Sequence, residues 1–160
     1  MRRVVVTGLG LVTPLAGSVS KSWDKLINSE SGISRIDGFD VEDLPAKIAG
    51  QVPNVEQEDG FDPNRCLELK EQRKVDRFIL FAIDAADQAI KDSKWEASSE
   101  EDSFRSGVLI GSGIGGLSTI EQATLVLNEK GPRRLSPFFI PSCLINLASG
   151  QVSIKNNFKG

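Results

Sequence analysis

A glycine-rich turn between an apolar run and a helical pattern constrains the fold of this chain more than any other feature. Residues 108–116 read Val-Leu-Ile-Gly-Ser-Gly-Ile-Gly-Gly, and an amphipathic pattern begins at Leu117. Gly111, Gly113 and Gly116 have the G-x-G-x-x-G spacing of a dinucleotide-binding loop. That spacing is informative only where a strand enters the turn and a helix leaves it, so the flanking patterns decide its meaning.

Two short apolar runs predict core strands. Val4–Val6 is β-branched and is followed by Thr7-Gly8-Leu9-Gly10, while Ser106–Ile110 leads into the glycine turn. Gly8 and Gly10 would allow a sharp turn or a close approach to a neighbouring element. Continuous apolar strands are typical of a sheet that is covered on both faces. We therefore expect an α/β fold.

Helical periodicity is visible in several segments of what we expect to be a single domain. Lys74–Ser93 is the clearest, because its apolar residues recur at intervals of three and four. Further helices are predicted from about Ser20 to residue 31, over Leu117–Leu127 and over Cys143–Ile154, with a short edge strand at Ala46–Gln51 and a proline-pinned loop at 133–141.

The composition excludes several classes of function. The chain has no histidine, two cysteines and a net charge of −3. It therefore lacks the commonest general base and metal ligand, and no carboxylate cluster suggests a metal site. The small net charge favours neither nucleic acid nor a membrane surface, and no apolar run approaches the ~20 residues of a membrane span. Without a disulfide framework or a signal-peptide pattern, we expect a cytoplasmic protein.

The dinucleotide interpretation of the glycine turn has two weaknesses. It requires a third strand that ends in an acidic residue about 20 positions beyond the motif. That window instead holds Arg134, Ser136, Pro137 and Phe138, and no phosphate-loop lysine follows the glycines. Two other interpretations remain open. The glycines simply allow a strand to turn into a helix, or they hold the side chain of Ile114 beside a small-molecule cavity.

Four stretches together resemble one enzyme family. They are Val4-Val5-Val6-Thr7-Gly8-Leu9-Gly10, Lys70-Glu71-Gln72-Arg73-Lys74-Val75-Asp76, the turn at 111–116, and Ser136-Pro137-Phe138-Phe139-Ile140-Pro141-Ser142. In order and spacing they resemble the β-ketoacyl-acyl-carrier-protein synthases, most closely the type II enzymes. The resemblance covers essentially the whole chain.

This resemblance implies a thiolase-like fold of layered helices and sheets, of which residues 1–160 would be the N-terminal part of the first half. It implies a homodimer that extends acyl chains by a decarboxylating Claisen condensation with malonyl-acyl-carrier-protein. The chain would end just before the family's nucleophilic cysteine and would lack its two histidines, so we expect these residues alone to be inactive. No cofactor is implied. A non-catalytic ketosynthase-like or truncated module that binds carrier protein is the alternative.

Particular residues acquire roles from the same resemblance. Ile114 resembles a gating residue of the acyl pocket, and Phe139 resembles a residue lining it. Gly111, Gly113, Gly115 and Gly116 would form a glycine hinge that carries Ile114. The cations expected to dock the acidic acyl carrier protein are Lys70, Arg73, Lys74, Arg133 and Arg134. Cations near the start of the helix predicted from Lys74 would oppose its dipole, which an anionic partner would explain.

Neither cysteine is expected to be catalytic. Cys143 follows Pro141-Ser142 at a predicted helix N-terminus, where a thiol pKa can be lowered. No base is available to it within this chain, and the family usually has a small residue such as threonine there. Cys66 lies in a segment with no motif. We therefore expect both cysteines to be packing residues, as buried free cysteines commonly are.

Overall fold

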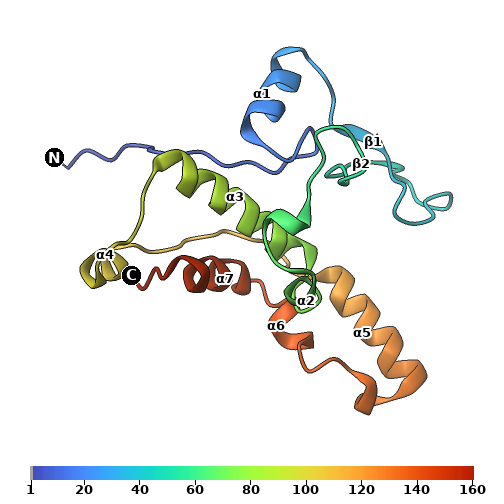
Figure 1. Cartoon of the computed structure of the whole chain (residues 1–160). Coiled ribbons are helices and arrows are strands. Elements are labelled where there is room, and N and C mark those ends of the chain that lie inside the picture. The colour runs from blue at the N-terminus through green and yellow to red at the C-terminus, as the bar shows by residue number, and fades with distance from the viewer. Residues whose placement is uncertain (1) are drawn as a thin grey trace.

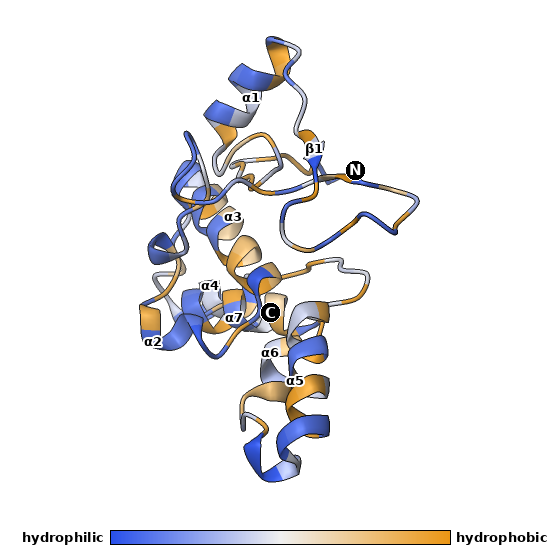
Figure 2. Cartoon of the chain, turned by 90° about the vertical axis from the view of Figure 1, so that its right-hand side faces the viewer, coloured by the Kyte–Doolittle hydropathy of each residue, from blue (hydrophilic) through white to orange (hydrophobic). Residues whose placement is uncertain are grey.

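A computed structural model describes residues 2–160 of the chain. Two helices, α3 and α7, lie side by side at its centre (Figure 1). Helix α1 and a small sheet lie at one end of the molecule, and α5 projects from the other end in both views (Figures 1 and 2). The elements are α1 (Val19–Ile27), β1 (Ile33–Arg35), β2 (Ile48–Gly50), η1 (Pro63–Arg65), α2 (Leu69–Gln72), α3 (Arg77–Ser93), α4 (Glu100–Arg105), α5 (Leu117–Lys130), η2 (Pro132–Arg134), α6 (Phe139–Cys143) and α7 (Leu147–Asn156).

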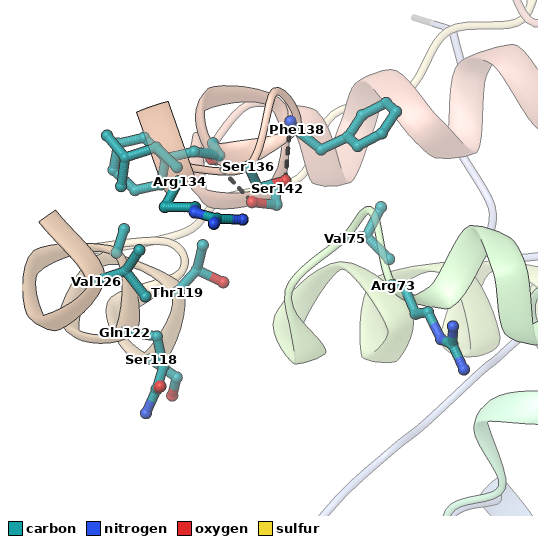
Figure 3. Close-up of a pocket in the computed structure, with 13 residues that line it drawn as sticks. Arg73, Val75, Ser118, Thr119, Gln122, Val126, Arg134, Ser136, Phe138 and Ser142 are labelled. Carbon is teal, nitrogen blue, oxygen red and sulfur yellow. Dashed lines mark hydrogen bonds between the residues drawn. The ribbon is translucent and has the colours of Figure 1, made fainter. Parts of the chain in front are cut away.

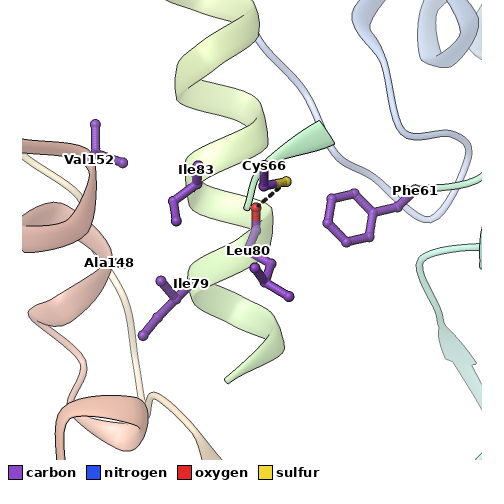
Figure 4. Packing of buried hydrophobic residues seen from close by; sticks show 7 residues of the cluster. All are labelled: Phe61, Cys66, Ile79, Leu80, Ile83, Ala148 and Val152. Carbon is purple, nitrogen blue, oxygen red and sulfur yellow. Dashed lines mark hydrogen bonds between the residues drawn. The ribbon is translucent and has the colours of Figure 1, made fainter. Parts of the chain in front are cut away.

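The hydrophobic core forms on two sides of α3. Ile79 and Ile83 face Ala148 and Val152 of α7, and on another side of the helix Leu80 packs with Phe61 and Cys66 (Figure 4). Ile79 and Ile83 are at most 1% exposed. Apolar residues of α3 thus pack on two sides of the helix.

The only sheet within residues 2–160 is a two-stranded antiparallel pair. Ile33 of β1 is opposite Gly50 of β2, and Arg35 is opposite Ile48. The edge strand predicted at Ala46–Gln51 is thereby confirmed at its centre. The two strands are not part of a larger sheet. They lie beside α1 and not in the core (Figure 1).

The two predicted core strands are not strands in this structure. Val4–Val6 and Ser106–Ile110 are extended but belong to no ladder. Val4 is 94% exposed and Leu109 is 100% exposed. An apolar run becomes a strand only where another strand satisfies its backbone groups, and no such neighbour lies beside either run within the described residues. The strand needed before a dinucleotide-binding turn is therefore missing too.

The N-terminal segment around Gly8 and Gly10 lies against α3, with its backbone close to the backbone of the helix. A Cβ atom on Gly8 would come 2.1 Å from the carbonyl oxygen of Ala89, and one on Gly10 would come 1.8 Å from that of Ala85. The expectation that these glycines permit close approach is confirmed. The Leu9 amide also donates to Asp92 Oδ2 at 3.0 Å.

Several predicted helix boundaries change. Helix α3 begins at Arg77 rather than Lys74, because Asp76 is its N-cap and accepts a hydrogen bond from the Phe78 amide. The loop predicted at 133–141 contains the end of η2 and the start of α6. The helix predicted over Cys143–Ile154 begins only at Leu147, as α7, because the backbone of Leu144 is extended. Helix α4 was not expected, although Ser99 caps it and acidic residues fill its first turn.

No described helix is both long and apolar enough to cross a membrane.

Candidate functional site

A cavity of about 380 Å³ lies between α5, the η2–α6 segment and the connection from α2 to α3 (Figure 3). The surface of the cavity as a whole is mainly apolar, with hydroxyl, amide and guanidinium groups among the apolar ones. The lining residues are Arg73, Val75, Ser118, Thr119, Gln122, Ala123, Val126, Arg134, Leu135, Ser136, Phe138, Phe139 and Ser142.

Three residues expected to serve two different purposes line this one cavity. Phe139, expected in the acyl pocket, and the predicted docking cations Arg73 and Arg134 all contribute to its wall. Figure 3 shows the Arg134 side chain extending between side chains of α5 and α6, whereas the Arg73 guanidinium points away from them. The cavity therefore has apolar walls with the Arg134 guanidinium between them, while Arg73 lies on the rim with its guanidinium pointing outward, an arrangement that suits an apolar chain attached to an anionic carrier.

Ile114 does not line the cavity. Its side chain is 66% exposed at the tip of the glycine turn. The sequence places Ile114 and Phe139 in one pocket, and this structure does not bring them together.

The remaining predicted docking cations differ in their surroundings. Lys74 Nζ lies 2.6 Å from Glu71 Oε1 and 5.3 Å from the centre of the Phe138 ring, so it already has an anionic and an aromatic partner. Lys70 and Arg133 are exposed outside the cavity lining. Within residues 2–160, no ion pair involves Arg73 or Arg134. Their charges are therefore available to a partner.

Lys70, Arg73 and Lys74 lie outside α3, which begins at Arg77, so the expectation that they oppose its dipole is wrong. Lys70 lies in the last turn of α2 and Arg73 is its C-cap. Lys74 follows in the connection before α3, outside that helix. Positive charge at the C-terminal end of a helix is favourable, so their placement needs no anionic partner to explain it.

The glycine turn, which was expected to act as a hinge, has two unequal halves. A Cβ atom on Gly111 or Gly113 would meet nothing within 4 Å. Gly115 has a φ of +93°, and a Cβ there would come 2.5 Å from the Cys143 carbonyl oxygen. On Gly116 it would come 2.8 Å from Asp76 Oδ2 and 2.9 Å from Cys143 Cα. The second half is therefore packed and needs glycine, whereas the first half is open.

Asp76 is a residue that the sequence reasoning missed. Its Oδ2 atom accepts hydrogen bonds from the hydroxyl of Thr119 at 2.6 Å and from the amide of Thr119 at 3.2 Å. Its own amide donates to the Ser142 carbonyl oxygen at 3.3 Å. A helix-start signal in the sequence could have identified Asp76 as an N-cap, but nothing local indicates its bond to α5.

A second polar cluster forms at Asp84 and Gln88 of α3. Arg65 donates to Asp84 Oδ2 at 2.8 Å and to the Gly17 carbonyl oxygen at 2.9 Å, and Gln88 donates to the same carboxylate at 3.0 Å. Burial raises the pKa of Asp84 above its ordinary value, although the charge of Arg65 opposes the effect. Because every group in it has a partner within the fold, this cluster holds the loop at Gly17 against α3.

Both cysteines are buried free thiols. Burial, together with the charges of Asp84 and Asp87, raises the pKa of Cys66 to about 12. The Cys66 thiol is therefore protonated at neutral pH and packs in the core. The Cys143 thiol donates to the Ile140 carbonyl oxygen at 3.6 Å. Residues 2–160 contain no group of three or more acidic or cysteine side chains that could hold a metal ion.

Proteins with similar folds are ketosynthases. A beta-ketoacyl synthase from Burkholderia phymatum STM815 superposes with a TM-score of 0.76 at 24% identity, over 100% of this chain and 38% of that one. A ketosynthase solved in complex with its type II PKS acyl-carrier protein, bound to the hexaketide, superposes with a TM-score of 0.74 at 23% identity. The superposition covers 99% of this chain and 40% of that one. The expected fold class, an α/β thiolase-like architecture, is confirmed by this likeness.

Sequence comparison gives the family. The chain is 52% identical over 161 residues to 3-oxoacyl-[acyl-carrier-protein] synthase 2 of Rhizobium meliloti and 48% identical over 159 residues to that of Coxiella burnetii. These alignments cover 100% and 99% of this chain but only 38% and 37% of the relatives. Residues 1–160 match the family described as Beta-ketoacyl synthase, N-terminal domain. The chain therefore belongs to the beta-ketoacyl synthase family.

Proposed function

We propose that this chain is the N-terminal part of a 3-oxoacyl-acyl-carrier-protein synthase. The complete protein would extend acyl chains by decarboxylating condensation with malonyl-acyl-carrier-protein. This part would supply one wall of the acyl pocket and cations that dock the carrier protein, while residues outside it would supply the catalytic cysteine and histidines. The synthases of Rhizobium meliloti and Coxiella burnetii, which are of this type by name, support the proposal.

The observation that carries the proposal is the arrangement at the cavity. Phe139 and Val126 offer apolar surface, and each buried CH₂ of an acyl chain gains ~0.8 kcal/mol. Arg73 and Arg134 stand at the edge of the same cavity without an ionic partner in the part of the chain that the structure describes. An acidic carrier that delivers an acyl chain matches both features, and a ketosynthase of similar fold has been solved with its acyl-carrier protein.

Charge reversal at the edge of the cavity tests the carrier role. The variant with Arg73→Glu and Arg134→Glu should bind acyl carrier protein roughly tenfold more weakly at low salt, because two attractions become repulsions. The difference should shrink at high salt, where exposed charges are screened. Titration of fluorescently labelled carrier protein measures the dissociation constant.

The matched control is Arg105→Glu. Arg105 lies on α4, is exposed and pairs only with Glu101 at 3.5 Å, so its reversal should leave carrier affinity unchanged. An unchanged dissociation constant for the double variant at low salt would refute the docking role. A free-energy loss per reversed charge equal to that of Arg105→Glu would show that net charge alone governs binding.

The role proposed for Ile114 depends on movement of the glycine turn. Gly111 and Gly113 have open surroundings, so this half of the turn is free to carry Ile114 toward an acyl chain. Ile114→Phe should then weaken binding of carrier protein that bears a long acyl chain, while carrier protein that bears a short acyl chain binds normally. Equal loss for short and long chains would indicate misfolding instead.

The alternative is a non-catalytic module that binds carrier protein without condensing acyl groups. The chain's span of 38% of the Rhizobium meliloti relative is the observation that keeps it open. Reading the coding sequence beyond Gly160 separates the two. A cysteine-bearing strand and two later histidine motifs support the enzyme, whereas a stop codon supports the module. A homodimer and a cytoplasmic location form part of the same proposal, and light scattering tests the first.

A further inference from the structure

The carboxylate of Asp76 caps two helices at once. Its Oδ1 atom accepts from the Phe78 amide at 3.4 Å, which makes Asp76 the local N-cap of α3. The N-cap of α5 is Gly116, which has no side chain to perform this task. Asp76 Oδ2 takes that place, since it accepts from the amide of Thr119, the third residue of α5. This is the amide that a capping side chain usually satisfies.

The same residue also fixes α6. Its amide donates to the Ser142 carbonyl oxygen, and the Gly116 amide donates to the carbonyl oxygen of Cys143 at 3.1 Å. Gly116 fits between Asp76 and Cys143 with no room for a Cβ atom. Asp76 therefore joins the first turns of α3 and α5 to the end of α6.

These bonds converge on the walls of the cavity. Val75, Thr119 and Ser142 all line it (Figure 3). Val75 precedes Asp76 in the chain, and Thr119 and Ser142 are two of the hydrogen-bond partners of Asp76. Asp76 itself does not line the cavity. It can affect a bound chain only through the walls that it holds in place.

We propose that Asp76 is a positioning residue that sets the distance between α5 and α6 and thereby the length of acyl chain that the cavity accepts. This role rests on the proposed acyl pocket. It concerns which acyl chains are bound and not how the carrier protein docks. The carrier protein meets Arg73 and Arg134 at the edge, while the acyl chain meets Thr119 and Ser142 inside. A change at Asp76 should therefore alter binding of acylated carrier and leave that of unacylated carrier unchanged.

The test compares dissociation constants of the chain for unacylated, hexanoyl and palmitoyl carrier protein. Asp76→Asn cannot present two acceptor oxygens, and Thr119→Val removes one donor while keeping the amide. Each should change the ratio of the palmitoyl to the unacylated constant by roughly tenfold, as expected for loss of a cap or a charge-assisted hydrogen bond. The hexanoyl constant should change less.

Matched controls exist for both substitutions. Thr124→Val makes the same change on α5, where the Thr124 hydroxyl bonds only to the Ile120 carbonyl oxygen, away from the cavity. Asp62→Asn makes the same change at the N-cap of η1, where a single oxygen accepts from the Asn64 amide, and Asp62 is also outside the cavity lining. Neither should alter the ratio of dissociation constants, even where it lowers the unfolding temperature.

The outcomes separate the two proposals. If the unaltered chain binds no form of carrier protein, the proposed function fails and the selectivity role fails with it. If the unaltered chain binds carrier protein but Asp76→Asn changes all three constants equally, only the positioning role is overturned. A ratio that changes in Asp76→Asn and Thr119→Val but in neither control supports it.

Discussion

Replacing Gly116 by alanine tests the packed half of the glycine turn directly. A Cβ atom at this position would lie 2.8 Å from Asp76 Oδ2 and 2.9 Å from Cys143 Cα. The carboxylate could turn away only by losing its bonds to Thr119. The Cα atom of Cys143 belongs to the backbone of α6 and could not move without shifting that helix. Gly111, where an added Cβ meets nothing within 4 Å, provides the matched comparison.

The expected magnitude follows from two opposing effects. Overpacking at a buried position costs about 1–3 kcal/mol. A glycine-to-alanine change also reduces the entropy of the unfolded chain, which stabilises the fold by ~0.4–1 kcal/mol where the backbone conformation permits alanine. For Gly116→Ala we therefore expect a net loss of about 1–2 kcal/mol. Gly111 does not have a positive φ, so Gly111→Ala should retain only the favourable effect.

Urea denaturation followed by circular dichroism measures both variants against the unaltered chain. The midpoint should fall for Gly116→Ala and remain equal or rise for Gly111→Ala, while the m-value is unchanged in both. A Gly116→Ala variant as stable as Gly111→Ala would refute the reasoning. It would mean that the contact between the turn and α6 is absent in solution.

Three further predictions concern the core. Ile83→Ala should lower the free energy of unfolding by about 2–5 kcal/mol, because Ile83 is 1% exposed, whereas Ile154→Ala, at 76% exposure, should change it little; urea denaturation measures both. Burial raises the pKa of Asp84 in the fold. At pH values between the ordinary aspartate pKa and this raised pKa, the folded state therefore binds more protons than the unfolded state. Stability relative to Asp84→Asn should therefore decrease with pH through the raised pKa, and denaturation at several pH values detects this; a rise would contradict it. Cys66, whose pKa is about 12, should react with iodoacetamide at pH ~8 only when urea unfolds the chain. Peptide mass spectrometry detects the alkylated cysteine, and alkylation of Cys66 in the folded chain would contradict this prediction.

The sequence by itself determined the helices whose apolar residues recur every three or four positions. The apolar repeat between Val75 and Ile90 defines α3, and the pattern from Leu117 places the start of α5 correctly. Both depend on contacts between residues three or four positions apart, which a sequence displays directly. Four short motifs in order were sufficient to indicate the family and its fold class.

Only the tertiary structure decided which extended segments become strands and which residues meet at the cavity. Val4–Val6 has the composition of a strand, but a strand depends on a partner that its own residues do not specify. Phe139 and Arg134 meet Arg73 across some 60 residues of chain, while Ile114 lies apart from them. The bond from Asp76 to Thr119 joins positions separated by 43 residues. Such contacts arise from the packing of whole helices, so no local pattern predicts them.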